Sequence, residues 1–313
     1  MSTDEGLQAA CAEMPVRPHG KAGDALVYRF GGEGNDWCFV RLPYQYDPDG
    51  KPHPWILCNH GNGWVMDGTE RKANWSEKTQ YGVDTQNDGA YLHMDAPGYR
   101  RYSNPTIEAF LRAGYVVCGA QNDGDLLYGN DNCTRACASF YQHMVETYRV
   151  ERKCFILGAS NGFMTTVGAV RTLGADRVLG IIGQYPLCHL RHAFMHTHRE
   201  GIKRAFGIAS DDIAEFESKA EDADPCRAPV SGTEDDAVSK WPPTLLVWSS
   251  TDQVLPMEEH AVKYAALLRA RGIAVDDIRV DQDGETCLHG SYKHFLPETF
   301  VSWCRTVRTR DAD

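Results

Sequence analysis

Residues 154–164 read Cys-Phe-Ile-Leu-Gly-Ala-Ser-Asn-Gly-Phe-Met, an apolar, strand-like tract that runs into a Gly-x-Ser-x-Gly pattern. Apolar residues at helical spacing follow, from Phe163 to about Leu173. Glycines two residues either side of Ser160 permit a sharp strand-to-helix turn that exposes the serine hydroxyl near a helix N-terminus, which favours a developing negative charge. The pattern predicts Ser160 as a nucleophile; a glycine-rich turn with an incidental serine is the alternative.

Composition limits the classes of protein that this chain can be. Its 313 residues, 42% hydrophobic and 24% charged, fit a single domain over 1–313 with room for insertions. The net charge of -11 and the lack of a basic face argue against nucleic-acid binding. No apolar run approaches the roughly 18–20 residues that span a bilayer. Residues 1–20 are polar and lack an apolar signal core, so we expect no membrane association and a cytoplasmic location.

The chain has eleven cysteines, an odd number. Cys58, Cys118 and Cys154 lie in apolar, strand-like runs, where a thiol behaves as a small hydrophobic group. Cys133 and Cys137 are four residues apart on a predicted helix, which is not a compact metal-binding spacing. We expect reduced, mostly buried thiols, with one or two disulfides as the alternative.

Short apolar runs alternate with helical patterns along the chain. Strands are predicted at 26–30, 37–42, 55–59, 115–119, 153–157, 178–183, 244–248 and 277–280. Helices are predicted at 106–113, 133–148, 163–173, 257–271 and 291–307. This alternation predicts an α/β fold, a mostly parallel central sheet flanked by helices. Such sheets carry their sites at the carboxyl ends of the strands.

Two segments interrupt the alternation. Residues 66–104 are polar and rich in Gly, Asn, Asp and Tyr, which predicts a long irregular insertion near the site. Residues 188–241 contain one or two helical patterns, at 189–206 and 211–220, and then a loop with Pro and Asp. Because this second segment lies between two predicted strands, we expect it to form a small helical lid over the carboxyl edge of the sheet.

A serine nucleophile needs a base, and the base needs an orienting carboxylate. Asp252 follows the predicted strand 244–248, which puts its carboxylate in a loop beside the Ser160 turn. His289 lies after the last predicted strand, and Gly290 follows it, so its ring can lean toward the serine. We predict Asp252 as the orienting acid and His289 as the base. His294 is the rival base, but it is predicted to lie in the first turns of the closing helix.

The stretch 59–64, Asn-His-Gly-Asn-Gly-Trp, follows the third predicted strand. Its glycines let backbone N–H groups approach a substrate oxygen. We therefore predict an oxyanion hole from the backbone N–H of Asn161 together with that of Asn62 or Gly63. His60 is expected to support this loop rather than to act as a base.

Four histidines, His189, His192, His196 and His198, lie within ten residues of the predicted lid. His192 and His196 are four apart, the spacing of a metal pair on a helix. No acidic residue at suitable spacing completes a metal site. We therefore expect no metal and no cofactor, and interpret the cluster as a polar face of a lid helix.

The order of these motifs resembles that of the α/β-hydrolase superfamily over roughly residues 25–308. The motifs are Asn59-His60-Gly61-Asn62-Gly63, Gly158-Ala159-Ser160-Asn161-Gly162, Asp252 and His289. The long helix before the elbow and the segment Asp252-Gln253-Val254-Leu255-Pro256 are similar to the prolyl-oligopeptidase-like and dienelactone-hydrolase-like branches. No propeller domain precedes the hydrolase-like part, which weakens the oligopeptidase interpretation.

The resemblance implies an α/β-hydrolase fold with Ser160 as nucleophile, His289 as base and Asp252 as orienting acid. The chain departs from many relatives at Phe163, which stands where they carry a second glycine after the elbow. The turn needs only Gly162, so this departure concerns the floor of the pocket rather than the triad.

We expect a serine hydrolase that cleaves a carboxylic ester of a small molecule through an acyl-enzyme. Trp64, Phe163 and Tyr185 are the predicted pocket walls. An amidase, a peptidase or an acyltransferase could use the same triad. From other classes, a non-catalytic ligand-binding protein on a hydrolase fold and metal-dependent chemistry at the histidine cluster are the alternatives. The sequence leaves the natural substrate and the oligomeric state open.

Overall fold

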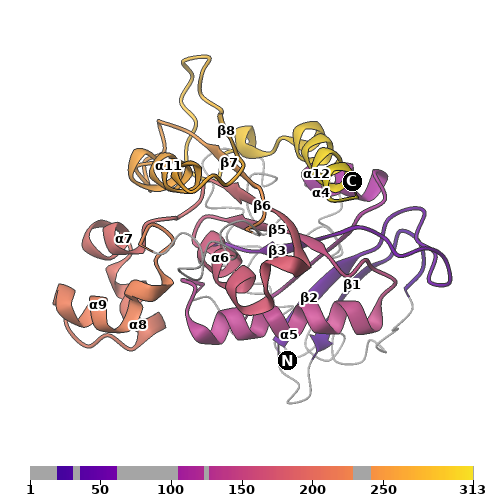
Figure 1. The fold of residues 1–313 in the computed structure, drawn as a ribbon, viewed down its shortest axis with the longest axis horizontal. Coiled ribbons are helices and arrows are strands. Elements are labelled where there is room, and N and C mark those ends of the chain that lie inside the picture. Colours follow the sequence, from indigo (N-terminus) through magenta and orange to yellow (C-terminus); the bar gives the residue numbers. More distant parts are fainter. Residues whose placement is uncertain (1–19, 31–35, 62–104, 123–126, 228–240, 313) are drawn as a thin grey trace, which may run out of the picture.

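The computed structural model describes residues 20–30, 36–61, 105–122, 127–227 and 241–312. Eight strands form one sheet in the order β1-β2-β4-β3-β5-β6-β7-β8 (Figure 1). Their bounds are β1 Ala25–Phe30, β2 Asp36–Arg41, β3 Trp55–Asn59, β4 Val116–Ala120, β5 Cys154–Ala159, β6 Val178–Gln184, β7 Thr244–Trp248 and β8 Val275–Arg279. Strands β3 to β8 are mutually parallel, and β2 is antiparallel to both β1 and β4. The predicted mostly parallel sheet is confirmed.

Helices cover both faces of the sheet (Figure 1). They are α4 Pro105–Arg112, α5 Asp131–Thr147, α6 Gly162–Leu173, α11 Lys263–Ala270 and α12 Pro297–Ala312. Helices α5, α6 and α11 contribute to one apolar cluster, whereas α4 and α12 pack together and contribute to the other. On β3, Trp55 and Leu57 face the first cluster, and Ile56 and Cys58 face the second. A strand covered on both faces therefore reads as a continuous apolar run rather than an alternating one.

The predicted elements differ from the observed ones chiefly near the C-terminus. Strand β8 begins at Val275, where it pairs with Thr244, although its sequence signal begins only at Asp277. The closing helix begins at Pro297, several residues later than expected, and a short 3₁₀ turn (Tyr292–His294) precedes it. Proline suits the first position of a helix, because its missing N–H has no intrahelical partner there.

Three short helices follow β6 and lie together at one side of the sheet (Figure 1). They are α7 Leu190–His196, α8 Arg199–Phe206 and α9 Ile213–Ala220. Phe194 and Phe216 stack between α7 and α9 with ring centroids 4.8 Å apart, and Ile202 of α8 is also buried. The predicted segment 188–241 is therefore largely helical where it is described, and its buried side chains belong to the same apolar cluster as those of α5, α6 and α11; its action as a lid stays a prediction.

Every cysteine in the described residues is a free thiol. Burial raises the pKa of the Cys118 and Cys154 thiols well above the usual range, so both are uncharged, inert groups of the core. No helix among the described residues is long and apolar enough to cross a bilayer.

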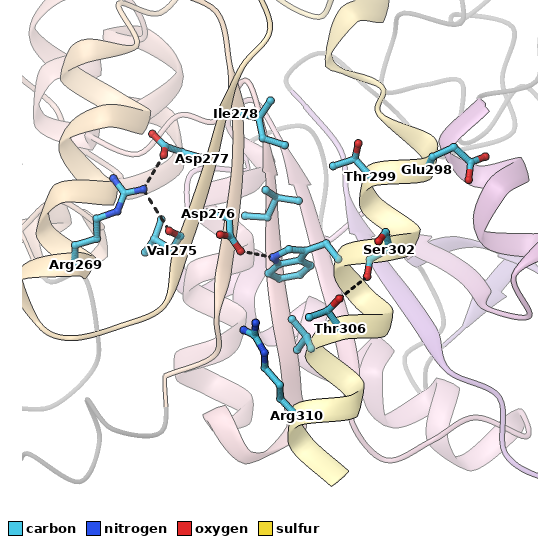
Figure 2. A pocket seen from close by; sticks show the side chains of 13 residues that line it. Arg269, Val275, Asp276, Asp277, Ile278, Glu298, Thr299, Ser302, Thr306 and Arg310 are labelled. Atoms are coloured by element: carbon cyan, nitrogen blue, oxygen red, sulfur yellow. Dashed lines mark hydrogen bonds and ion pairs between the residues drawn. The ribbon is translucent and has the colours of Figure 1, made fainter. Parts of the chain in front are cut away.

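A groove of about 760 Å³ lies between the edge strand β8 and helix α12 (Figure 2). Arg269 donates to the Asp277 carboxylate over 2.7 Å and to the Val275 carbonyl over 3.3 Å. Trp303 Nε1 donates to Asp276 over 2.8 Å from the α12 side. Charged side chains and a covered carbonyl oppose pairing with another strand, so this edge is protected. None of Ser160, Asp252 and His289 lines the groove.

Candidate active site

Ser160 occupies the sharp turn between β5 and α6. Its φ of 51° lies in the left-handed region that non-glycine residues rarely adopt. Three hydrogen bonds hold this backbone: the Ser160 N–H donates to the Gln184 carbonyl over 3.0 Å, and the Ser160 carbonyl accepts the N–H groups of Leu187 over 2.9 Å and Phe163 over 3.2 Å. The serine is therefore fastened to the end of the neighbouring strand β6.

The two glycines of the pattern are required by close contacts as well as by the turn. A Cβ at Gly162 would lie 2.3 Å from the His60 carbonyl oxygen, and one at Gly158 would lie 2.4 Å from Thr166 Oγ1. Because the Gly162 contact is with backbone, no side-chain rotation could relieve it. The elbow thus packs directly against the segment that follows β3.

The structure brings Ser160, His289 and Asp252 together. His289 Nε2 lies 2.9 Å from Ser160 Oγ, and His289 Nδ1 lies 2.7 Å from Asp252 Oδ2. An ionised carboxylate only accepts hydrogen bonds, so Nδ1 carries the ring proton and Nε2 is left to accept the serine hydroxyl hydrogen. This is the arrangement that a general base requires.

The side chain of Asp252 is buried, and backbone N–H groups donate hydrogen bonds to its carboxylate. Its side chain is 1% exposed, against 16% for that of His289. Asp252 Oδ1 accepts the N–H groups of Val254 over 2.8 Å and Leu255 over 2.9 Å, which leaves Oδ2 for the histidine. The loop after β7 therefore orients the carboxylate independently of its hydrogen bond to the imidazole.

Thr251 joins the loops of Asp252 and His289, a role that the sequence did not indicate. The Cys287 N–H donates to Thr251 Oγ1 over 2.8 Å, and the threonine hydroxyl donates back to the Cys287 carbonyl over 3.3 Å. A further bond joins Thr251 N–H to Ser249 Oγ over 3.1 Å. The two bonds to Cys287 connect segments that lie far apart in sequence and so limit the relative motion of His289 and Asp252.

A second network, also missed from the sequence, joins the ends of β3 and β4 to α6. Asn122 Nδ2 donates to Asn59 Oδ1 over 2.8 Å, and Asn59 Nδ2 donates to Thr166 Oγ1 over 2.9 Å. Thr166 donates to the Gly162 carbonyl over 3.1 Å. All four residues are buried. The only sequence signal was two asparagines placed at the ends of apolar runs.

The predicted oxyanion hole is described on one side only. Asn161 is fully buried and immediately precedes α6, whereas Asn62, Gly63 and Trp64 lie outside the described residues. The ring nitrogens of buried His60 lie 2.8 Å from the Gly61 carbonyl oxygen and 3.2 Å from that of Gln121. Both ring nitrogens of His60 thus contact backbone carbonyl groups.

Phe163 and Tyr185, the other predicted pocket walls, both have buried side chains. Phe163 is fully buried, its ring centroid is 5.7 Å from that of Tyr264, and the ring packs on Gly183. Phe163 therefore belongs to the core between α6, α11 and the sheet. Tyr185 is 1% exposed and its ring lies against that of His289. The role of both residues in substrate binding stays a prediction.

The histidine cluster gains a member that the sequence did not single out. The His260 ring lies 5.3 Å from that of His192, which in turn lies 4.5 Å from that of His196. His260 Nδ1 accepts the N–H groups of Cys188 over 3.3 Å and His189 over 3.2 Å. Burial lowers the pKa of His260 well below its usual value, so the ring is neutral and holds the start of the 188–241 segment. Among the described residues, no group of three or more His, Cys, Asp or Glu side chains is arranged to hold a metal ion.

His294, the rival base, lies in the 3₁₀ turn rather than in the closing helix. Its side chain is fully buried, and Nδ1 lies 3.0 Å from the Ser291 carbonyl oxygen. Burial lowers the pKa of His294 to about 4. With its ring against Tyr185 and its Nδ1 directed at a carbonyl, His294 is a neutral structural histidine.

This burial predicts a loss of stability in acid. The unfolded chain binds a proton at His294 below about pH 6.5, whereas the folded chain does so only near pH 4. The free energy of unfolding should therefore decrease as the pH is lowered from about 6.5 to about 4, and His294 should account for a loss on the order of 3 kcal/mol. Urea unfolding across this range checks it, with His294→Gln as the comparison. Equal slopes for the two proteins would contradict the assignment.

No protein-family model and no curated protein sequence matches this chain, but solved structures do. A sugar hydrolase from Lactococcus lactis aligns with a TM-score of 0.53 at 18% identity, over 91% of this chain and 98% of the other. An esterase from Rhizomucor miehei aligns with a TM-score of 0.56 at 16% identity, over 96% of this chain and 88% of the esterase. The acylaminoacyl peptidase of Pyrococcus horikoshii gives 0.61 at 13% identity, over 91% of this chain but only 42% of the peptidase.

Proposed function

Because the chain has the α/β-hydrolase fold, we propose that it is a serine hydrolase that cleaves a carboxylic ester of a small molecule. The observation that carries the proposal is the pair of short distances at His289, 2.9 Å to Ser160 Oγ and 2.7 Å to Asp252 Oδ2. A structural ion pair would explain the second distance but not the first. A serine hydroxyl directed at the free nitrogen of a carboxylate-bound imidazole is the arrangement of an activated nucleophile.

Acylation begins when His289 Nε2 takes the proton of Ser160 Oγ and the oxygen attacks the acyl carbonyl carbon. The backbone N–H of Asn161, with that of Asn62 or Gly63, stabilises the resulting oxyanion. Asp252 holds the ring and stabilises the imidazolium that forms. The same ring then donates its proton to the departing alkoxide as the C–O bond breaks.

Deacylation repeats these steps with water in place of the serine. His289 Nε2 removes a proton from water, hydroxide attacks the acyl-enzyme carbonyl, and the same nitrogen returns the proton to Ser160 Oγ as the acyl C–O bond breaks and the carboxylic acid is released. We propose that the helices of the 188–241 segment limit the access of substrate; residues 66–104, the other predicted insertion, lie outside the described residues. Burial lowers the pKa of His189, His192 and His198 in the 188–241 segment, so these rings can offer hydrogen bonds to a polar substrate without adding charge.

A second candidate function is cleavage of an amide or peptide with the same residues. The structural neighbours favour it, since they include a peptidase besides esterases. An amide has a poorer leaving group than an ester, so the demand on His289 as an acid is greater. A panel of p-nitrophenyl esters and matched p-nitroanilides separates the two: we expect turnover of the short esters and little of the anilides.

Covalent labelling tests the nucleophile without knowledge of the natural substrate. A fluorophosphonate should react with one site per chain, and peptide mass mapping should place the adduct on Ser160. A non-catalytic binding protein would bind small esters without forming this adduct. Absence of any adduct, or an adduct on another serine, would sink the proposal.

A further inference from the structure

Three non-glycine residues of the described chain have a positive φ: Asn122 at 55°, Ser160 at 51° and Tyr185 at 37°. They follow β4, β5 and β6 at the carboxyl edge of the sheet. Asparagine visits the left-handed region readily, and the serine is the elbow residue. Tyr185 has no such reason, because a bulky aromatic residue with positive φ is an outlier. Backbone strain of this kind collects at functional sites, where the surrounding structure maintains it.

Hydrogen bonds maintain the backbone of Tyr185. Its N–H donates to the Val247 carbonyl over 2.7 Å and so continues the pairing between β6 and β7. Two residues later, the Leu187 N–H donates to the Ser160 carbonyl. The turn at Tyr185 therefore lies between the nucleophile's own backbone and the strand that leads to Asp252.

The ring of Tyr185 contacts two imidazoles. Its centroid is 4.8 Å from that of His289 and 4.9 Å from that of His294, with interplanar angles of 70° and 72°. His294 is itself held, since its Nδ1 contacts the Ser291 carbonyl and its own carbonyl accepts Gln184 Nε2 over 3.0 Å. The three rings form an edge-to-face cluster in which Tyr185 and His294 are buried and His289 is partly exposed.

We propose that Tyr185 is a positioning residue for His289, the base of the proposed triad. Its ring blocks rotation of the imidazole away from Ser160, with His294 as the backing. The inference rests on the proposed function and deepens it. It matters most in the acyl-enzyme: once Ser160 Oγ carries the acyl group, its hydrogen bond to Nε2 is lost. Of the two hydrogen bonds that hold the His289 ring, only that to Asp252 then remains, and the edge-to-face contact with Tyr185 keeps Nε2 aimed at the incoming water.

The main variants remove the ring or only the hydroxyl. Tyr185→Leu should lower kcat for p-nitrophenyl acetate by about 10- to 100-fold, because small misplacements of a catalytic group carry losses of this size. Its KM should stay within a few-fold. Tyr185→Phe keeps the ring and should restore kcat to within about twofold of the wild type. Tyr185→Gly suits the positive φ, so it should fold and still lose kcat as the leucine variant does.

Two readouts separate positioning from a general loss of packing. The pH profile of kcat should change in the leucine and glycine variants only, because a ring free to move and more hydrated takes up a proton more easily. Tyr115→Leu is the matched control: Tyr115 is an equally buried tyrosine on the opposite face of the sheet, in the second apolar cluster. This control should lower thermal stability and leave kcat and the pH profile unchanged.

A proton NMR signal tests the placement of the ring without any turnover. The low-field resonance of His289 Nδ1–H, bound to Asp252, should be sharp in the wild type and in Tyr185→Phe. In Tyr185→Leu and Tyr185→Gly it should broaden or vanish. An unchanged resonance, kcat and pH profile in these two variants would overturn the inference, as would an equal loss of kcat in Tyr185→Phe. Failure of the proposed function looks different: the wild type would show the resonance but neither turnover nor labelling of Ser160.

Discussion

Replacing Ser160 by alanine is expected to lower kcat/KM for a short p-nitrophenyl ester by a factor of about 10⁴ or more, leaving at most a slow background reaction. The alanine has no oxygen to attack the carbonyl, and His289 Nε2 loses the group that lies 2.9 Å away. The fold should persist, because the bonds of Ser160 to Gln184 and Leu187 are made by its backbone. Initial rates, with thermal unfolding measured on the same samples, check both statements.

Ser218 on α9 offers a matched control for this substitution. Its hydroxyl bonds only the Glu215 carbonyl of its own helix among the described contacts. Ser218→Ala should therefore keep full activity and full labelling by the fluorophosphonate. An active Ser160→Ala protein would show that the nucleophile is another group.

Replacing Asp252 by asparagine is expected to lower kcat by about 10³- to 10⁴-fold with little change in KM. The N–H groups of Val254 and Leu255 must still be accepted by an oxygen, so the asparagine Oδ1 takes the place of the present Oδ1. The amide NH₂ then faces His289 and donates to Nδ1. The ring proton moves to Nε2, and the base can no longer accept the proton of Ser160.

The measurement for Asp252→Asn is the pre-steady-state rate of acylation, together with the rate of labelling by the fluorophosphonate. Both should fall while binding of a non-reactive ester analogue persists. Asp49→Asn changes an exposed acid in the loop between β2 and β3 and should leave both rates unaltered. A loss of less than tenfold in Asp252→Asn would mean that the carboxylate does not set the ring tautomer.

Much of the fold could be predicted because its signals are local. The buried strands are continuous apolar runs, and β3 and β7 were predicted with their observed bounds. Strand β8 was predicted late because it is an edge strand, half-exposed and carrying Asp276 and Asp277. The closing helix was predicted too early because residues 291–296 could continue a helix by composition, whereas the buried His294 turn and Pro297 make the helix begin later.

The order Ser160, Asp252, His289 was readable for a similar reason. Each residue follows the carboxyl end of its own strand or precedes the last helix, and parallel strands bring such ends to one edge. The sequence could not predict the distances between these three side chains or the hydrogen bonds that hold the surrounding loops. Thr251 binding Cys287, and Asn122 binding Asn59, join segments whose proximity depends on the order of strands in the sheet.

The elbow, the candidate nucleophile, and the loops that carry the candidate acid and base follow from the amino-acid sequence, because turn chemistry and apolar periodicity act over a few residues. Which side chains lie against those groups follows instead from the packing of the whole fold. Tyr185 and Phe163 were both read as pocket walls, yet one lies under the candidate base and the other in the core. The physical reason is that a side chain's neighbours are set by the strands packed beside it, and strand order is a property of the whole sheet.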